Sequence, residues 1–130
     1  MTRGLNKVLL IGNLGRDPDL KYTPSGKPIT TFTLACTRNW ITSNGERRDA
    51  TEWFNIVAWG PLAEICKQHL VKGSRIYIDG HLRTRTWEDQ SGQKQTTVEV
   101  VAKEMIMLDN RPGPVERLEA QPDDLYDDAE

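Results

Sequence analysis

The chain has 130 residues, enough for one domain and a tail but too few for two independent cores. Its hydrophobic fraction of 37%, with 10 glycines in addition, is ordinary for a globular protein and excludes disorder over the whole length. Residues 1–112 carry 16 Lys and Arg against 12 Asp and Glu, whereas residues 113–130 carry 1 against 7. Beneath the overall charge of −2, the body is therefore +4 and can attract phosphates, while the tail is −6.

Few residues are of a kind or spacing that suits catalysis or metal binding. Cys36 and Cys66 form no CxxC pair and have no histidine at ligand spacing, so we predict neither a disulfide nor a zinc site and expect both in the core. His69 and His81 have no nucleophile or orienting carboxylate near them in sequence, which predicts a protein that is not an enzyme and needs no cofactor. The chain shows no signal-peptide core and no run of membrane-spanning length, so we expect a cytoplasmic protein without a membrane partner.

The first elements in chain order are two strands joined by a turn-rich segment. Residues 5–14 place aliphatic groups on both faces, which predicts a strand that is central or covered on its second face by another subunit. Residues 15–28 contain the glycine, proline and aspartate typical of turns. Residues 29–38 alternate as a second strand. Its inward positions are predicted to be Phe32, Leu34 and Cys36.

A polar loop after Trp40 leads to a third strand at residues 51–59. Its entirely apolar face, the better core candidate, consists of Phe54, Ile56 and Ala58. The other face carries Trp53, Asn55, Val57 and Trp59. Trp53 and Trp59 are therefore expected on the same outer face, roughly 20 Å apart along the strand.

One short helix and two further strands complete the predicted domain. Pro61 suits the first position of a helix, apolar residues follow at helical spacing, and Gly73 is a natural stop. The fourth strand starts near Ser74, and Gly80 within it suggests a bulge. One side of this strand is expected to carry Ile76, Ile78 and Leu82, and the other Arg83, Arg85 and Trp87.

A turn at residues 89–92 makes a hairpin with the last strand, residues 95–108. One parity of that strand holds Val98, Val100, Ala102, Ile106 and Leu108. Five strands with a helix between the third and the fourth predict an all-β, five-stranded Greek-key barrel of the OB type over residues 1–109. Residues 110–130 change to a short acidic segment, which we predict to be a disordered tail.

The four tryptophans lie close in sequence to cationic residues or turns. Any one tryptophan could be an ordinary packing residue, but stacking rings interleaved with cations are what sequence-independent binding of single-stranded nucleic acid requires. Arg38 precedes Trp40, and an arginine pair leads to Trp87. The predicted interface consists of Trp40, Trp53, Trp59, Trp87, Arg3, Lys7, Arg38, Lys72, Arg83 and Arg85.

Several separate segments, in order, resemble the bacterial single-stranded DNA-binding proteins. The segments that carry the resemblance are residues 3–8, 12–18, 51–53, 60–64, 72–85 and 87–92. The resemblance implies an OB fold, a nucleoid-associated homotetramer, and coating of single-stranded DNA in replication, recombination and repair. Trp40, Trp53 and Trp87 match family tryptophans that stack on bases, and Trp59 falls where the family has an aromatic residue, often phenylalanine. The basic positions associated with the DNA path are matched by Arg3, Lys7, Lys72, Arg83 and Arg85.

The tail departs from the family pattern. Family members commonly end, after a long linker, in an acidic tip with a Pro-Phe pair that recruits replication and repair enzymes, whereas the linker here is short and the pair is absent. In place of that pair, we predict that partners bind an apolar pair between aspartates, formed by Asp123, Asp124, Leu125, Tyr126, Asp127 and Asp128. The alternative is a solvating tail that competes weakly with DNA for the basic surface.

The residues are also compatible with two other functions. One is an OB-fold module that binds RNA or belongs to a replication-restart complex, because nothing in the sequence identifies the sugar. The other is a protein-interaction adaptor whose functional part is the acidic tail. Site size, binding mode and cooperativity have no signature in the residues.

Overall fold

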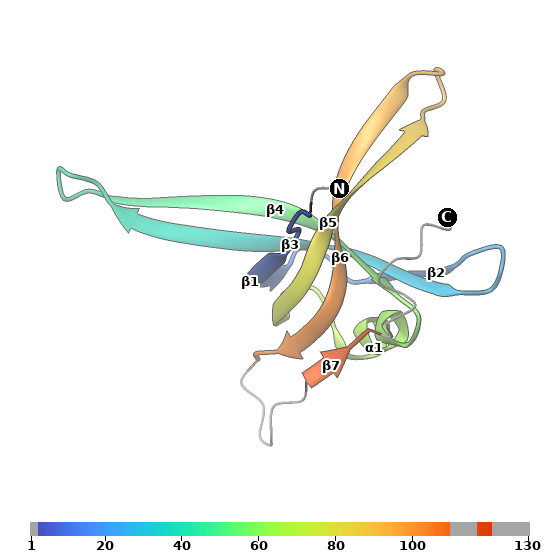
Figure 1. Cartoon of the computed structure of the whole chain (residues 1–130). Coiled ribbons are helices and arrows are strands. Elements are labelled where there is room, and N and C mark those ends of the chain that lie inside the picture. The colour runs from blue at the N-terminus through green and yellow to red at the C-terminus, as the bar shows by residue number, and fades with distance from the viewer. Residues whose placement is uncertain (1–2, 110–116, 121–130) are drawn as a thin grey trace.

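The computed structural model describes residues 3–109 and 117–120, which form seven strands and one helix (Figure 1). The elements are β1 (Val8–Leu14), β2 (Asp19–Tyr22), β3 (Pro28–Ile41), β4 (Arg47–Trp59), α1 (Pro61–His69), β5 (Arg75–Glu88), β6 (Lys94–Met107) and β7 (Arg117–Glu119). In this described part of the chain, no helix has the length and apolar character that crossing a membrane requires.

Five of the strands close into a barrel, as predicted for the OB type. Their order is β1-β5-β6-β4-β3, and β1 pairs with β3 to complete the circle. All these pairings are antiparallel except β4 with β6, which run parallel where Ile56 faces Val100 and Val57 faces Val101. The barrel interior holds one large cluster of buried side chains, to which Phe32, Ile56 and Ile78 contribute.

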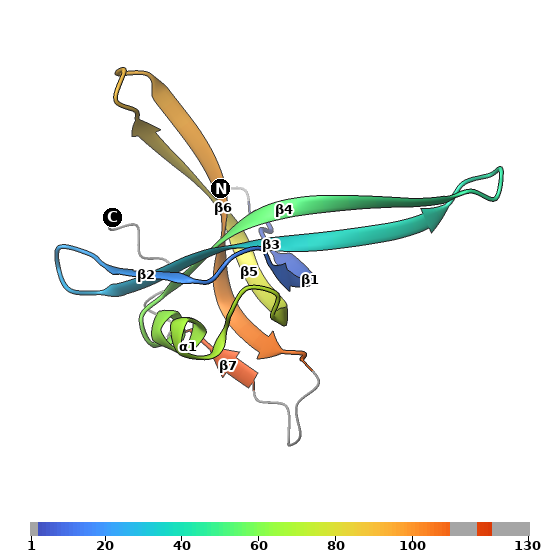
Figure 2. The same cartoon turned by 180° about the vertical axis from the view of Figure 1, so that it is seen from behind.

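Two long hairpins extend beyond the barrel as arms (Figures 1 and 2). One is made by β3 and β4, which pair from Ile29 opposite Trp59 out to Ile41 opposite Arg47. The other is made by β5 and β6, which pair out to Glu88 opposite Lys94. Residues 39–41 and 47–50, expected in a loop, continue the strands of the first arm, because the turn that reverses the chain is confined to residues 42–46.

Helix α1 packs against the barrel at the end away from the arms (Figure 2). It begins at Pro61, as predicted, and buries Leu62, Ala63 and Cys66. The buried Thr30 hydroxyl on β3 donates a 2.7 Å hydrogen bond to the carbonyl of Ala63 and ties the helix to the sheet. The helix ends at His69, earlier than the stop expected at Gly73.

The predicted bulge at Gly80 is present and changes which side chains of β6 face the core. Asp79 pairs with Glu104 and Gly80 with Ala102, so that Lys103 is the extra residue. The extra residue reverses the parity of β6, so that Met105 enters the core and Ile106 and Leu108 lie on the outer face, no longer on the same side as Val100 and Ala102 as expected. Leu82 keeps the parity of Ile76 and Ile78, as expected, and faces Val100, but it lies farther out along the arm and is exposed.

Two short strands were not predicted. Residues 19–22, within the segment expected to contain only turns, form β2 on the free edge of β3. Residues 117–119, within the expected tail, form β7, which pairs antiparallel with β6 at positions 104–106. The remainder of that tail, including the proposed anchor at residues 123–128, lies outside the described residues.

Candidate nucleic-acid interface

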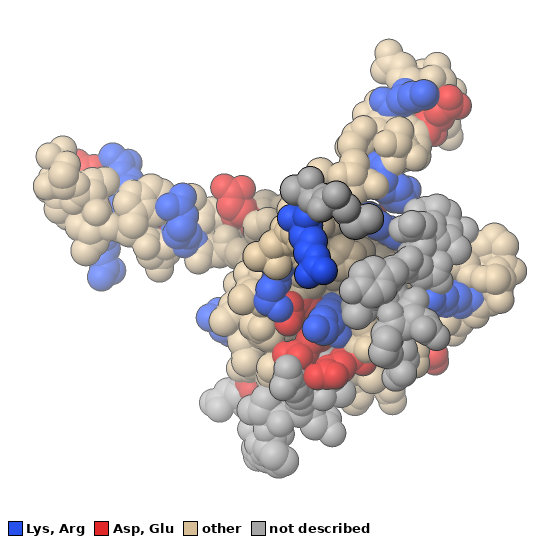
Figure 3. All heavy atoms as spheres, in the orientation of Figure 1, with Lys and Arg blue, Asp and Glu red and all other residues tan. Residues whose placement is uncertain are grey.

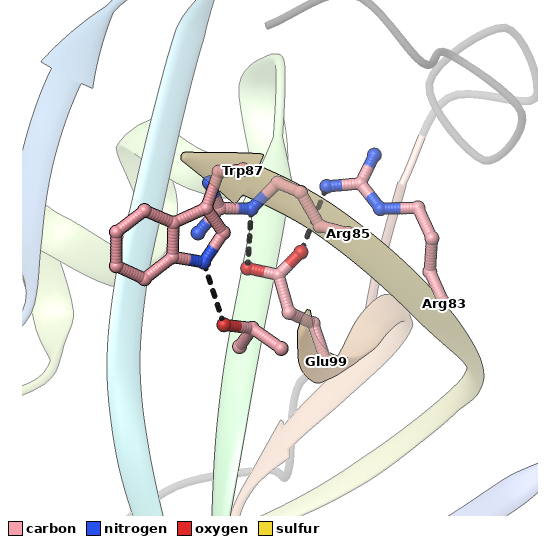
Figure 4. Close-up of polar contacts among 5 residues, drawn as sticks. Arg83, Arg85, Trp87 and Glu99 are labelled. Carbon is pink, nitrogen blue, oxygen red and sulfur yellow. Dashed lines mark hydrogen bonds and ion pairs between the residues drawn. The ribbon is translucent and has the colours of Figure 1, made fainter. Parts of the chain in front are cut away.

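The outer face of the β5–β6 arm carries the basic and aromatic side chains predicted for β5. Arg83, Arg85 and Trp87 follow one another at every second position and so point to one side of the strand. Glu99 on β6 lies directly opposite Arg83 in the pairing register. Its carboxylate accepts a 3.0 Å hydrogen bond from Arg83 Nη2 and forms a 3.6 Å ion pair with Arg85 Nε (Figure 4).

Trp87 is the last ring on this arm and is held from β6. Its indole Nε1 donates a 3.0 Å hydrogen bond to the hydroxyl of Thr97, the unlabelled threonine of Figure 4. The turn beyond it is organised by Asp89, whose carboxylate accepts bonds from the Ser91 hydroxyl, the Gln95 amide and the Gln93 backbone. These bonds, the one from Ser91 foremost, lower the pKa of Asp89 to about 2.

The β3–β4 arm presents a second ring, Trp40, near its tip. The Arg38 guanidinium lies 4.6 Å from the centroid of the Trp40 ring, which is cation–π geometry. An open hollow of about 400 Å³ beside this ring is lined by Asn39, Trp40, Ile41, Arg47, Arg48 and Asp49. In the view of Figure 3, cationic side chains lie along both arms and over the barrel face between them.

Trp53 on β4 lies nearer the barrel than Trp40. Its ring packs over Gly15, where a Cβ atom would lie only 2.4 Å from Trp53 Cζ3. Residues Trp40, Trp53 and Trp87 are 38%, 61% and 41% exposed, and their rings contact Arg38, Gly15 and Thr97 respectively, so each ring is both held and accessible. This is the arrangement that stacking on a base requires.

A smaller hollow of about 210 Å³ lies where the two arms meet the barrel. Strands β3, β4, β5 and β6 all contribute to its walls. The lining residues are Arg16, Thr31, Phe32, Asn55, Ile56, Val57, Arg85, Thr97 and Glu99. The hollow thus brings Asn55, which lies between the two tryptophans of β4, together with Arg85 of the opposite arm.

Trp59 is the site residue whose predicted exposure is wrong. The two faces of β4 are divided as expected, but Trp59 is only 1% exposed because Val57, Val101 and Ile29 form a second buried cluster with it. Lys27 and Arg83 stand 5.5 and 5.7 Å from its ring centroid. A base can reach this indole only if some of these groups move.

Of the six predicted cations, only Arg85 lines the smaller hollow among the described residues, and three of the others lie away from both arms. Arg3 is exposed on the segment before β1. Lys7 forms a 3.1 Å ion pair with Asp79, which offsets part of its charge. Lys72 is exposed after α1, and its backbone N–H donates to the Asp17 carboxylate.

Three residues of the interface were missed in the sequence. Arg16 follows a glycine in a turn and had no aromatic neighbour to distinguish it. Glu99 and Thr97 did carry a signal, since each is a polar residue in a valine-rich strand at the parity that faces Arg83 and Arg85. Pairing the two strands of the hairpin in sequence would have found both.

The groups considered for other chemistry have ordinary positions. Burial raises the pKa of the Cys66 thiol to about 12, and the thiol packs in the core as predicted. Burial, and then the charge of Arg83, lower the pKa of His81. Across the residues that the structure describes, no group of three or more His, Cys, Asp or Glu side chains could hold a metal ion.

Comparisons with known proteins agree with this geometry. The family model described as "Single-strand binding protein family" matches residues 5–108. "Single-stranded DNA-binding protein 1" of Chlorobaculum tepidum is 50% identical over 109 residues, which cover 83% of this chain and 67% of the relative. The solved structure "Plasmodium falciparum SSB complex with ssDNA" is 32% identical, has a TM-score of 0.76, and is matched over 84% of this chain and 99% of its own.

Proposed function

The chain belongs to the single-strand binding protein family, and we propose that it coats and protects single-stranded DNA, without sequence preference, in replication, recombination and repair. The observation that carries this proposal is the pairing of exposed rings with cations on two arms that flank one hollow. Stacking accepts any base, and arginine neutralises the phosphates between successive bases. We propose that the protein acts by binding and not by catalysis, and that it does so in the cytoplasm, at the nucleoid.

A fluorescence titration tests the proposal. Adding a thymidine homopolymer should quench the tryptophan emission, and the logarithm of the binding constant should fall linearly with the logarithm of salt concentration, by about 0.7 per neutralised phosphate. A duplex of equal length should bind far more weakly, since its bases are already stacked. Absence of both quenching and a salt slope would refute the proposal. An RNA strand of matched sequence that bound more tightly than DNA would redirect it to RNA.

We also propose that the protein acts as a homotetramer. The outer face of β1, β5 and β6 exposes Leu9 and Ile11 and continues into a shallow hollow lined by Ile11, Tyr77, Glu104, Ile106 and Leu108. An apolar face of this kind on a protein that works in water marks an interaction surface. Sedimentation equilibrium should give the mass of four protomers for the unmodified chain and a smaller mass for Ile11→Asp. Val71→Asp, which adds the same charge at an exposed valine after α1, should leave the mass unchanged.

The acidic tail is proposed to recruit replication and repair proteins through residues 123–128. A chain that ends at Ala120 retains β7 and lacks residues 121–130, five of which are acidic. This truncation should leave binding of single-stranded DNA unchanged or tighter, because a competing anionic segment is lost. Loss of DNA binding in the truncated chain would contradict the assignment of the interface to the barrel and its arms.

A further inference from the structure

A carboxylate is buried within the proposed phosphate-binding surface. Glu99 has a side chain only 7% exposed, and it lies on the face of the β5–β6 arm that carries Arg83 and Arg85. Figure 4 shows it reaching from β6 to between the two guanidinium groups. One of its oxygens accepts from Arg83 at 3.0 Å, and the other faces Arg85 Nε at 3.6 Å.

The negative charge of Glu99 weakens the attraction of the arm for phosphates. Burying that charge is also unfavourable unless the two arginines are well placed to compensate it. We propose that Glu99 is a positioning residue for single-stranded DNA, which sets the direction of the Arg83 and Arg85 side chains before the strand arrives. The inference rests on the proposed function, since it concerns the same surface.

The geometry supports positioning in two ways. Arg83 is held on two sides, by Glu99 and by the ring of Trp59 at 5.7 Å, and its side chain is only 15% exposed. Arg85 is more accessible, and it lines the hollow between the arms together with Glu99 and Thr97. A guanidinium has five N–H donors in a fixed fork, so one carboxylate cannot engage all the donors of Arg85.

Positioning reduces the entropy that binding must remove. A free arginine samples many rotamers, and ordering it on the DNA lowers affinity, whereas an arginine already held by a carboxylate loses little more. The same carboxylate also separates two like charges that would otherwise repel at adjacent positions on one face of β5. Glu99 therefore has opposite effects on binding, a loss of charge attraction and a gain of order, and we infer that the gain of order is the larger.

The two effects predict opposite results for Glu99→Gln, which removes the charge and keeps the shape. Positioning predicts that affinity for a thymidine homopolymer falls about three- to tenfold, the scale of freezing one or two arginine side chains, even though the protein gains positive charge. Glu88→Gln is the matched control, because Glu88 is an exposed carboxylate of the same arm, at the end of β5. That control should bind as tightly as the unmodified protein or more tightly. Equal or tighter binding by Glu99→Gln would overturn the inference.

A double-mutant cycle separates positioning from a merely structural role. If Glu99 acts through the two arginines, Glu99→Gln should weaken binding no further in a chain that already carries Arg83→Gln and Arg85→Gln. An undiminished loss in that background would contradict positioning. Should Glu99→Gln fail to fold, Glu99→Asp replaces it: the charge is kept, the reach is shortened by one methylene, and wild-type affinity would count against the inference.

The outcome for the unmodified chain distinguishes the two proposals. If that chain fails to bind the homopolymer, the proposed function is wrong. If it binds and Glu99→Gln binds as well as Glu88→Gln, the function stands and only the role of Glu99 is wrong.

Discussion

The indole of Trp87 is hydrogen-bonded to the hydroxyl of Thr97 on the facing strand, 3.0 Å away. A ring at the end of a two-stranded arm has few neighbours to fix its orientation, and 41% of Trp87 is open to solvent. The bond ties the edge of the ring to β6 and leaves a face for a base. Thr97 is therefore coupled to DNA binding through a residue that it orients.

Thr97→Val should weaken binding of single-stranded DNA by less than Trp87→Ala does. Removing the ring costs about 1–3 kcal/mol per stacked base. Removing only the hydroxyl costs at most about 1 kcal/mol, because water can replace a lost hydrogen bond at an exposed indole. Thr96→Val, at an exposed threonine one residue away, should have no effect on titrations of the same homopolymer. Equal losses for the two threonine variants would contradict the coupling.

Gly15→Ala should displace the ring of Trp53 while the barrel stays folded. The new Cβ atom would lie 2.4 Å from Trp53 Cζ3 and 2.7 Å from the Thr33 hydroxyl, and both groups are ends of side chains that can move. We expect weaker binding of single-stranded DNA and a shifted tryptophan emission, with little change in melting temperature. Gly4→Ala is the control, since nothing lies within 4 Å of that position. A variant with unaltered emission and affinity would show that Trp53 does not depend on this support.

The sequence predicts the barrel well because its strands are specified locally. Alternation identifies β3 and β4, the Gly60-Pro61 pair marks the start of α1, and Gly80 identifies the bulge. Strands β2 and β7 have no such signal. Each is short and polar and becomes a strand only because the edge of β3 or β6 is available for pairing, which is a property of the assembled sheet.

Trp59 shows the same limit within the interface. Parity placed it correctly on the face shared with Trp53, but parity does not say what covers a face at each point along a strand. Val101, distant in sequence, reaches Trp59 because β4 and β6 pair in parallel only at that end. Nothing pairs with β4 in this way near Trp53, in the part of the chain that the structure describes. Trp59 is buried and Trp53 is exposed because only Trp59 is covered by Val101, a contact that exists only in the folded barrel.

Gly80→Ala should destabilise the barrel strongly. A Cβ at this position would lie 2.2 Å from the carbonyl oxygen of Val101, which is backbone and cannot rotate away as a side chain can. The clash must open the pairing of β5 with β6 at the bulge. We expect a loss of at least about 2 kcal/mol in the free energy of unfolding, measured by urea denaturation. A midpoint within error of the Gly4→Ala variant would show that the bulge can shift to make room.

Asp89 should make the stability of the β5–β6 arm depend on acid. Hydrogen bonds from Ser91, Gln95 and Gln93 favour the carboxylate, so the pKa of Asp89 is about 2 in the folded protein against an ordinary value of 3.8. A depressed pKa means that the contribution of Asp89 to stability is complete above the unfolded-state value and disappears as the pH falls through the folded-state value. The melting temperatures of the unmodified protein and Asp89→Asn should therefore differ by a constant amount above about pH 5 and converge between about pH 4 and pH 2.

The comparison isolates Asp89 because every other carboxylate titrates in both proteins and cancels in the difference. Glu88→Gln supplies a control of the same charge change on the same arm, and its difference from the unmodified protein should not follow the Asp89 curve. A difference for Asp89→Asn that persisted unchanged to pH 2 would mean that ionisation of Asp89 is not what stabilises the arm.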